Sequence, residues 1–433
     1  MIIYCHDQCN EQNPAVGTVP GTYAYCTKYY RQLRVKPFAR VLRSHSIRQR
    51  WTRAKRRQTL PSGPPHSLAV LNSTTCTNQT KQKRDNMKFT PSSRDWATSV
   101  LSATPLALEQ ELRAPWDRLA AALAEIQQPS AHEYMCAHGH VKYALDNVTR
   151  SRYSNILPFD HGVVRVSRGG YINASWIRFA DLSSAVSPFI IAQGPMHPRF
   201  YGEDTTGSFW EMVFEHRAKA VVNLARCETG FGGCARYWPL HENSETYGES
   251  IIVTVKSCEE LEPGLWRRLI SLRRNGMSDA AGRGHDLEHF HFENWPNYEI
   301  ATDASTTATL LRRVVQLSVE AEPDGGGGGR DHSENSARPI VVHCSGGVGR
   351  SGTFVAAAAT LLLCGGFSKQ QQQDNWSSTR FAGLIAVMRK QRHPWMVEGF
   401  EQFAFGARLA SSVILRFSSS GLEERAGVAQ TKK

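Results

Sequence analysis

The 433-residue sequence has no acidic residue between Glu11 and Asp85. Residues 1–84 hold 15 basic residues against two acidic ones, a net charge of about +13. The whole chain carries +12, so the remainder is close to neutral. The basic character therefore belongs to the N-terminal segment and not to the part of the chain that is expected to fold.

Paired cysteines and long apolar runs are also missing. None of the ten cysteines forms a CxxC pair, which argues against a zinc site and against a disulfide framework, and favours a reducing compartment. The longest apolar run, at 353–367, is short for a bilayer span and predicts a buried helix. We expect no metal, no cofactor, no transmembrane segment and no requirement for nucleic acid, in a monomer of the cytoplasm.

Residues 1–100 are predicted to be a basic, disordered N-terminal extension, because this composition cannot bury enough apolar surface to fold. Four alternatives stay open: a nuclear-import segment, a segment that binds an anionic surface, an organelle transit sequence, and upstream translated sequence that the working protein lacks, with Met87 as its start. The first of these leaves a nuclear location open.

The chain from 101 to 415 alternates strand-like and helix-like segments. The strand-like runs are 171–179, 188–195, 218–226, 250–258, 287–295 and 338–344. Helical periodicity is found at 105–128, 205–217, 304–322, after Arg350, and at 400–417. This alternation predicts an α/β (α+β) domain built around one central sheet with helices against it.

Two low-complexity pieces, 323–337 and 368–375, interrupt this domain and are predicted to be flexible surface insertions. Residues 416–433 are predicted to be a disordered C-terminal tail.

The stretch HCSGGVGRSG at 343–352 follows a short apolar strand and precedes an apolar helix. Its glycines let successive backbone N–H groups point inward, and the helix N-terminus and the Arg350 guanidinium add positive charge. One dianion fits such a site. The predicted phosphate cradle consists of Ser345, Gly346, Gly347, Val348, Gly349 and Arg350.

The same positive field should lower the pKa of Cys344 and make it a thiolate. A thiolate beneath a phosphoryl group can attack in line and form a thiophosphate, which water later hydrolyses. Arg350 would hold the equatorial oxygens, and the Ser351 hydroxyl would stabilise the departing thiolate. The plainer alternative is a buried core cysteine beside an ordinary turn.

The stretch resembles the signature loop of the protein tyrosine phosphatases, and further motifs in the family's order extend the resemblance over about 105–415. They are RYSNILPFD (152–160), YINASWI (171–177), FIIAQGP (189–195), FWEMVFEH, VVNLARCETGFGGCARYWP and MRKQRHPWMVEGFEQFAF. The resemblance implies the family's tyrosine-specific, non-receptor-like domain, with a highly twisted mixed sheet, and phosphotyrosine proteins as partners.

The resemblance also implies roles for single residues. Tyr153 would stack on the substrate ring and set a pocket depth suited to phosphotyrosine, and Asn155 stands where many members grip the peptide backbone. Glu228 would pair with Arg350, and His343 would orient the loop. The plainer alternatives are an ordinary half-buried aromatic for Tyr153, a surface glutamate for Glu228 and a structural histidine for His343.

The sequence departs from the family's pattern at two positions. Trp295 and Pro296 match the family's mobile Trp-Pro-Asp loop, but Asn297 replaces the aspartic acid that protonates the leaving oxygen, and an amide cannot act as a general acid. Glu299 could take over this role or be an ordinary exposed side chain. Glu398 stands where the family usually has a water-positioning glutamine, whereas Gln402 matches the second such glutamine.

Three functions therefore stay open. The first is a tyrosine phosphatase that works slowly or on substrates with good leaving groups. The second is a pseudophosphatase that captures phosphotyrosine peptides without hydrolysing them. The third is hydrolysis of another phosphoester such as a phosphoinositide, which the deep pocket expected around Tyr153 disfavours.

Overall fold

A computed structural model of the chain describes one compact unit within Asn72–Lys433. The described residues are 87, 89–126, 140–168, 170–184, 186–198, 203–227, 233–240, 243–276, 284–320, 338–367 and 375–430, the last 14 of these and 123–126 by their backbone alone. Glu228 and the expected insertion 323–337 lie outside the described residues, as does all but Asn375 of the expected insertion 368–375.

An eight-stranded sheet forms the centre of the unit, in the order β1-β2-β8-β3-β7-β6-β5-β4. The strands are β1 (Ala174–Ile177), β2 (Phe189–Ala192), β3 (Ala220–Asn223), β4 (Ser244–Tyr247), β5 (Ile251–Glu262), β6 (Leu265–Arg274), β7 (His285–Phe292) and β8 (Ile340–His343). The inner strands β2, β8, β3 and β7 are parallel, and all other neighbours are antiparallel. The expected mixed sheet is thereby confirmed.

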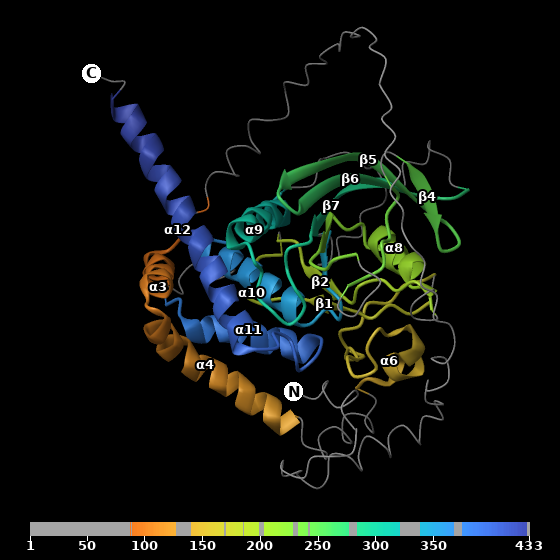
Figure 1. Cartoon of the computed structure of the whole chain (residues 1–433), viewed down its shortest axis with the longest axis horizontal. Coiled ribbons are helices and arrows are strands. Elements are labelled where there is room, and N and C mark those ends of the chain that lie inside the picture. The colour runs from red at the N-terminus through yellow and green to blue at the C-terminus, as the bar shows by residue number, and fades with distance from the viewer. Residues whose placement is uncertain are drawn as a thin grey trace, which may run out of the picture. The chain divides into compact units, whose positions relative to one another are not determined.

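Helices lie on both sides of the sheet (Figure 1). One group contains α3 (Pro91–Ser102), α4 (Pro105–Ile126), α9 (Ala304–Val319), α10 (Gly349–Cys364), α11 (Ser378–Gln391) and α12 (Phe400–Gln430). The other side carries α8 (Thr206–Glu215). The short helix α6 (Lys142–Asp146), followed by the 3-10 turn η2 (Val148–Arg150), lies on the same side of the unit as α8.

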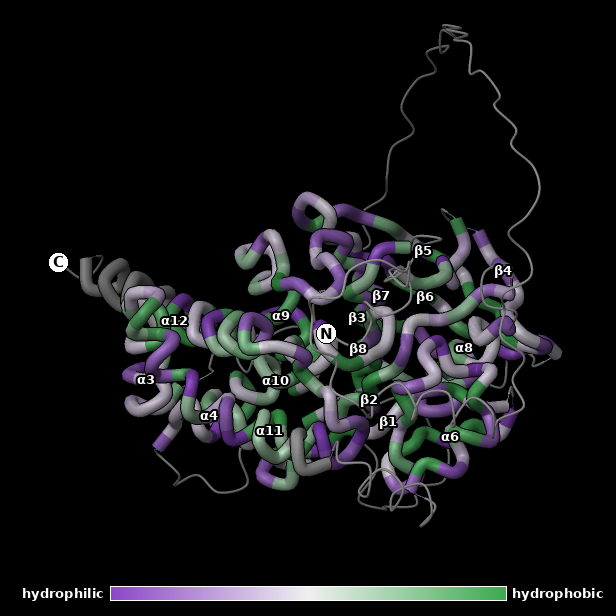
Figure 2. Tube along the Cα trace, turned by 60° about the horizontal axis from the view of Figure 1, so that its bottom comes forward, coloured by the Kyte–Doolittle hydropathy of each residue, from purple (hydrophilic) through white to green (hydrophobic). Residues whose placement is uncertain are grey.

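The inner strands alternate between two hydrophobic cores, because successive side chains of a strand point to opposite faces. In β8, Ile340 and Val342 pack with the α9–α12 side, while Val341 packs with the α8 side. Figure 2 shows apolar residues along β2 and β8. The helix α10 is buried on nearly every side, as an all-round apolar sequence requires. This burial fixes the place where β8 passes into α10.

The N-terminal boundary of the folded part differs from the prediction. Residues 91–100 were expected to be disordered, but they lie in α3, which begins after Thr90, whose hydroxyl accepts a hydrogen bond from the Ser93 N–H. Trp96 is buried in the main core, edge to face with Trp376. Helix α3 is part of the folded unit because Trp96 and Val100 give it an apolar face that packs into the main core, and the basic residues before it offer no such face.

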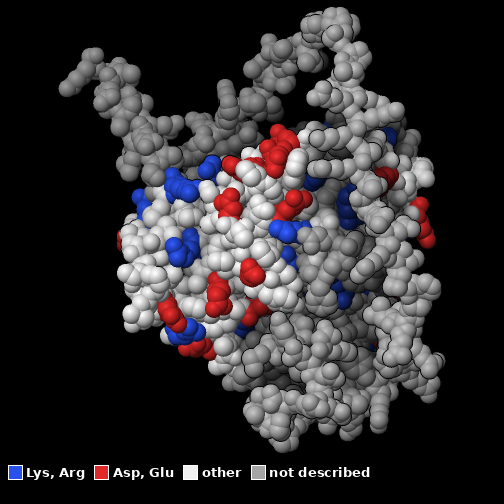
Figure 3. Space-filling view, in the orientation of Figure 1, with Lys and Arg blue, Asp and Glu red and all other residues white. Residues whose placement is uncertain are grey.

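The C-terminal boundary also differs, since α12 continues past residue 415 to Gln430. No described helix is long and apolar enough to cross a membrane. Figure 3 shows acidic and basic side chains mixed over the visible face of the described part. This mixture agrees with a nearly neutral charge outside residues 1–84.

Candidate active site

The site begins where β8 ends. Cys344 follows the last strand residue, His343, and α10 starts five residues later at Gly349. Gly347 has φ +69°, a conformation that glycine adopts without strain, and a Cβ added there would lie 2.2 Å from the Ala192 carbonyl oxygen. In this turn the Gly347 N–H points at the Cys344 Sγ, at an N–S distance of 3.3 Å. The turn therefore aims a backbone donor at the sulfur.

Cys344 is buried, and burial alone would raise the pKa of its thiol. The charge of Arg350 and the neighbouring Ser351 and Val348 groups outweigh this effect and lower the pKa of Cys344 below its ordinary value. Ser351 Oγ is buried and has no hydrogen-bond partner of ordinary geometry among the described residues. The result is a thiol primed to ionise.

Arg350 lies at the first turn of α10 and is 3% exposed. Its Nη1 donates to the carbonyl of Trp295 at 2.9 Å and to the carbonyl of Leu224 at 3.2 Å. Its Nη2 donates to the Asn297 side-chain oxygen at 2.9 Å. Arg350 therefore joins the signature loop to the Trp295–Asn297 segment, as a mobile loop closing on the cradle would require.

That segment holds its own shape through Trp295. The indole is buried, packs edge to face on Phe405, and donates from Nε1 to the Glu299 carbonyl at 3.0 Å. The Glu299 side chain is exposed. The hydrogen bonds described for this residue, from Trp295 Nε1 and Gln402 Nε2, are both accepted by its backbone carbonyl. The geometry thus brings Asn297 to the cradle and leaves the Glu299 carboxylate outside it.

Tyr153 lies beside the cradle from the other side. Its hydroxyl is 2.7 Å from Ser345 Oγ, and its ring is 3.3 Å from the place where a Cβ on Gly346 would stand. Asn155 is exposed, and its carbonyl lies 3.2 Å from His393 Nε2. The structure therefore places the Tyr153 ring against the signature loop and the Asn155 side chain at the surface.

Glu398, just before α12, and Gln402, in the first turn of α12, converge on Gly349. A Cβ on this glycine would lie 2.3 Å from Glu398 Oε2 and 2.7 Å from Gln402 Oε1, so only glycine admits both groups there. Glu398 as a whole residue is exposed, but its carboxyl lies against Gly349, and desolvation there raises the pKa of Glu398 to about 6 against the opposing charge of Arg350.

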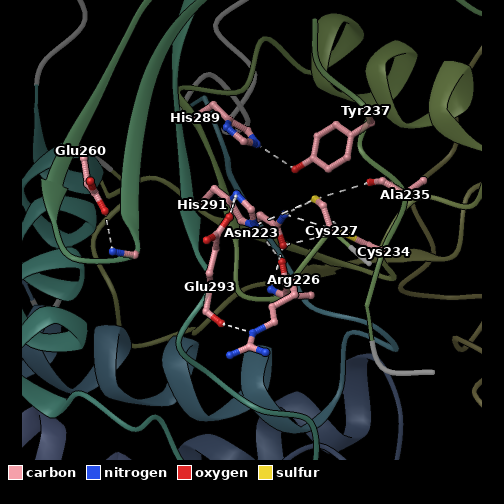
Figure 4. Close-up of polar contacts among 12 residues, drawn as sticks. Asn223, Arg226, Cys227, Cys234, Ala235, Tyr237, Glu260, His289, His291 and Glu293 are labelled. Carbon is pink, nitrogen blue, oxygen red and sulfur yellow. Dashed lines mark hydrogen bonds and ion pairs between the residues drawn. The ribbon is translucent and has the colours of Figure 1, made fainter. Parts of the chain in front are cut away.

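His343 belongs to a buried polar chain behind the loop. Burial lowers the pKa of His343 to about 3, so the ring is neutral at pH 7. Its Nδ1 is 3.2 Å from the Cys344 carbonyl, which can only accept, so the proton sits on Nδ1. His343 Nε2 then accepts from the Tyr237 hydroxyl at 2.6 Å. The Tyr237 hydroxyl also lies 3.0 Å from His289 Nε2, as Figure 4 shows.

Figure 4 also shows the segment that precedes Glu228, whose pairing with Arg350 stays a prediction. Arg226 donates from Nε to the Glu293 carbonyl at 3.0 Å, and the Cys227 and Cys234 sulfurs are 3.8 Å apart. Among the described residues no group of three or more metal-ligating side chains is found.

Two residues at the site escaped the sequence reasoning. Arg392 is fully buried and donates to the carbonyls of Gly347 at 2.6 Å and Gly346 at 3.1 Å, and to Asn173 Oδ1 at 3.0 Å. Arg392 therefore fixes the backbone of the phosphate cradle through two of its carbonyls. The RHPW sequence around it is part of the resemblance, but nothing in its local pattern predicts contacts with residues 45 positions away.

Tyr298 is the second such residue. It is 50% exposed and has φ +64°, a strained value for a non-glycine residue. Partial burial raises the pKa of Tyr298, and nearby Tyr153 and Glu398 act in the same direction. Tyr298 directly follows Asn297 and is close enough to Tyr153 and Glu398 for their charges to act on it.

Comparisons with known proteins agree with this geometry. The family model described as protein-tyrosine phosphatase matches residues 147–411. Receptor-type tyrosine-protein phosphatase C of Rattus norvegicus is 31% identical over 216 residues, covering 48% of this chain and 15% of that protein. Tyrosine-protein phosphatase non-receptor type 2 of Homo sapiens is 30% identical over 233 residues, covering 53% of this chain and 49% of that protein. The chain thus spans half or less of the length of these relatives.

Among solved structures, the catalytic domain of human protein tyrosine phosphatase non-receptor type 18 has the same fold. The TM-score is 0.53 at 22% identity, and the match covers 73% of this chain and 99% of that domain. The family match includes β8, the Cys344 turn, Arg350 and the Trp295 segment. The chain belongs to the protein-tyrosine phosphatase family.

Proposed function

We propose that this chain hydrolyses phosphotyrosine in proteins through a cysteinyl-phosphate intermediate, with a slow first step. The observation that carries the proposal is the buried Cys344 thiol, whose pKa is lowered beside Arg350 in a turn of inward-pointing backbone. A core cysteine without such a field would have a raised pKa, as burial produces for Cys364.

In the first step the Cys344 thiolate attacks phosphorus, the bond to the tyrosine oxygen breaks, and the cradle and Arg350 hold the three remaining oxygens. The departing phenolate needs a proton. Asn297 cannot supply it, and the Glu299 side chain points to solvent. The loss of a general acid slows this step by about 10²–10⁴-fold.

In the second step water attacks the cysteinyl phosphate, and phosphate and the Cys344 thiolate are released. Glu398 and Gln402 both lie against Gly349, next to the phosphate cradle. Gln402 can orient the water, and Glu398, which is ionised above about pH 6, can take its proton. The Ser351 hydroxyl stabilises the leaving sulfur.

A pseudophosphatase is the second candidate, and Asn297 is the observation that favours it. Its amide bonds Arg350, so the cradle is joined to a loop that lacks a proton donor. Such a site would hold a phosphotyrosine peptide and release it unchanged. Phosphoinositide hydrolysis has less support, since the Tyr153 ring against Gly346 forms a wall suited to an aryl phosphate.

Turnover of p-nitrophenyl phosphate separates the two candidates, because its leaving group needs little protonation. We expect a slow steady state with a burst of p-nitrophenol, and a phosphate label on Cys344 after rapid acid quench. Cys344→Ser should abolish both signals, while Cys258→Ser, an exposed cysteine outside the site, should leave them unchanged. Binding of the compound without release of p-nitrophenol would overturn the proposal in favour of the pseudophosphatase.

The natural substrate class remains phosphotyrosine proteins by proposal. Action as a monomer, without nucleic acid, in the cytoplasm or the nucleus, stays a prediction from the sequence.

A further inference from the structure

A second cavity lies at the end of the sheet opposite to Cys344. It has a volume of about 950 Å³ and is bordered by the end of β1, the start of β2, the end of α8 and the residues before β8. In the parallel pair β2 and β8, Phe189 is in register with Ile340, so Pro188 and Pro339 border the cavity at the amino ends of both strands. Cys344 follows the carboxyl end of β8, one strand length away.

Positive charge dominates the lining of this cavity. Arg178, Arg217 and Arg338 line it, against one acidic residue, Glu215. The Glu215 carboxylate already accepts hydrogen bonds from the Ser167 N–H at 2.9 and 3.1 Å and from the Ser167 hydroxyl. The Glu215 carboxylate is therefore held by Ser167, and its described hydrogen bonds do not involve the three arginines.

Two of the arginines, Arg178 and Arg338, contact uncharged groups. The Arg178 guanidinium lies 4.2 Å from the centre of the Trp176 ring, and burial lowers the pKa of Arg178. Arg338 donates from Nε to the Arg217 carbonyl at 2.6 Å. The Arg217 backbone has a left-handed φ of +50°. Within the described part of the chain neither Arg178 nor Arg217 has an ion-pair partner.

One buried polar group in the lining lacks a partner. Ser187 is 1% exposed, and its Oγ has no hydrogen-bond partner among the described residues, although its N–H donates to the Ser318 carbonyl at 2.9 Å. Buried hydroxyls are nearly always satisfied in proteins. Ser187 therefore lies in the wall of the cavity, and Trp176 and Phe179 add aromatic surface to the lining.

We propose that this cavity binds a phosphomonoester that carries an apolar body, with Arg178, Arg217 and Arg338 as the anion-binding residues. Arginine forms paired hydrogen bonds with phosphate oxygens, and three arginines match a dianion better than a single carboxylate. The volume lies in the range of small-molecule sites and exceeds the need of a phosphate ion alone. The body of the ligand packs on Trp176 and Phe179.

Calorimetric titration with phenylphosphonate tests the proposal, because this dianion has an apolar body and cannot be hydrolysed. The full chain carries Arg350→Ala, which disables the Cys344 cradle as a competing site. We expect one binding event with a Kd of about 0.1–1 mM. Arg178→Gln should weaken it about tenfold or more, and Arg217→Asn, whose asparagine tolerates left-handed φ, should do the same.

Controls decide between specific and general effects. Arg113→Gln, on the exposed face of α4, should leave the Kd unchanged, and the melting temperature of each variant reports its folding. With Arg350 intact, Arg178→Gln should keep full turnover of p-nitrophenyl phosphate. Binding that disappears in Arg350→Ala alone, or that survives both cavity variants, would overturn the proposal whether or not the chain proves to be a phosphatase.

Further ligands define the source of the anion. Inorganic phosphate should bind more weakly than phenylphosphonate, because it lacks the apolar body. Benzoate should also bind more weakly, since it carries one negative charge. Equal affinity for benzoate would contradict a phosphomonoester site. A peptide with phosphoserine between apolar residues, compared with hexyl phosphate, distinguishes a peptide ligand from a small molecule by which of the two binds more tightly.

Discussion

The signature loop and the Trp295–Ala301 segment face each other across one site, but they differ in completeness. The loop around Cys344 has a thiol with a lowered pKa, which we propose as the nucleophile, a buried arginine, and hydrogen bonds from Arg392 to its carbonyls. The facing segment has the buried Trp295 but an amide at Asn297. In the proposed reaction, phosphate binding and proton delivery therefore belong to separate segments of this fold.

The largest effect on turnover is expected from a change in the signature loop, at Arg350. Arg350→Lys keeps the charge but loses the planar guanidinium that bonds the Trp295 and Leu224 carbonyls and the Asn297 amide. We expect kcat for p-nitrophenyl phosphate to fall by about 10²–10³. Steady-state kinetics measure the change, with Arg113→Lys on α4 as control. A loss below threefold would mean that Arg350 does not stabilise the transition state.

The incomplete side should respond in the opposite direction. Asn297→Asp introduces a carboxyl where the amide now bonds Arg350, and once the loop has rearranged around substrate it can protonate the phenolate. We expect kcat on a phosphotyrosine peptide to rise about 10- to 100-fold near pH 6. Asn297→Ala, which also breaks the Arg350 contact, should give no gain. An unchanged rate in Asn297→Asp would indicate that another acid, such as Glu299, already serves.

The next largest effect is expected at Glu398, which lies against Gly349 at the start of α10. Because the pKa of Glu398 is raised to about 6, its carboxylate form, the base, is gained as pH rises through 6. Turnover of p-nitrophenyl phosphate should therefore rise over pH 5–7, and Glu398→Gln should remove this limb and lower the plateau about tenfold. Glu401→Gln, on the exposed start of α12, is the matched control. A limb that persists in Glu398→Gln would assign the titration to another group.

The smallest effect is expected at the pocket wall. Tyr153→Phe keeps the ring against Gly346 and removes only the hydroxyl that contacts Ser345, so KM for a phosphotyrosine peptide should change by less than about threefold. Tyr153→Ala removes the wall and should raise KM about tenfold or more. Equal KM values for the two variants would show that the ring does not contact the substrate.

Much of the fold could be predicted because the inner strands are short apolar runs. β2, β3 and β8 lie within the expected segments, and β7 overlaps its expected segment but begins two residues earlier, at His285. β4 and β6 were missed, since SETY is largely exposed and LWRRLISLRR places arginines among its apolar residues. α3 was missed because its two apolar anchors, Trp96 and Val100, adjoin a basic segment.

The site was predictable where its residues adjoin in sequence and obscure where contacts cross the chain. Cys344, Arg350 and Ser351 share one turn, so their spacing indicates their chemistry. Arg392 braces that turn from a different segment, and Tyr237 supports His343 from 106 residues away. The Asn297 contact with Arg350 depends on how the Trp295 segment folds against α10, which no local pattern encodes.

The central claim is a complete nucleophile without a proton donor, and the dependence of rate on the leaving group tests it most directly. The rate of phenol release in a single turnover, with protein in excess over substrate, is measured for a series of aryl phosphates whose phenols span a wide pKa range. We predict a steep fall in rate as the pKa of the phenol rises, and a shallow fall in Asn297→Asp. A shallow dependence in the unaltered chain would contradict the account, because it would show that a proton already reaches the leaving oxygen.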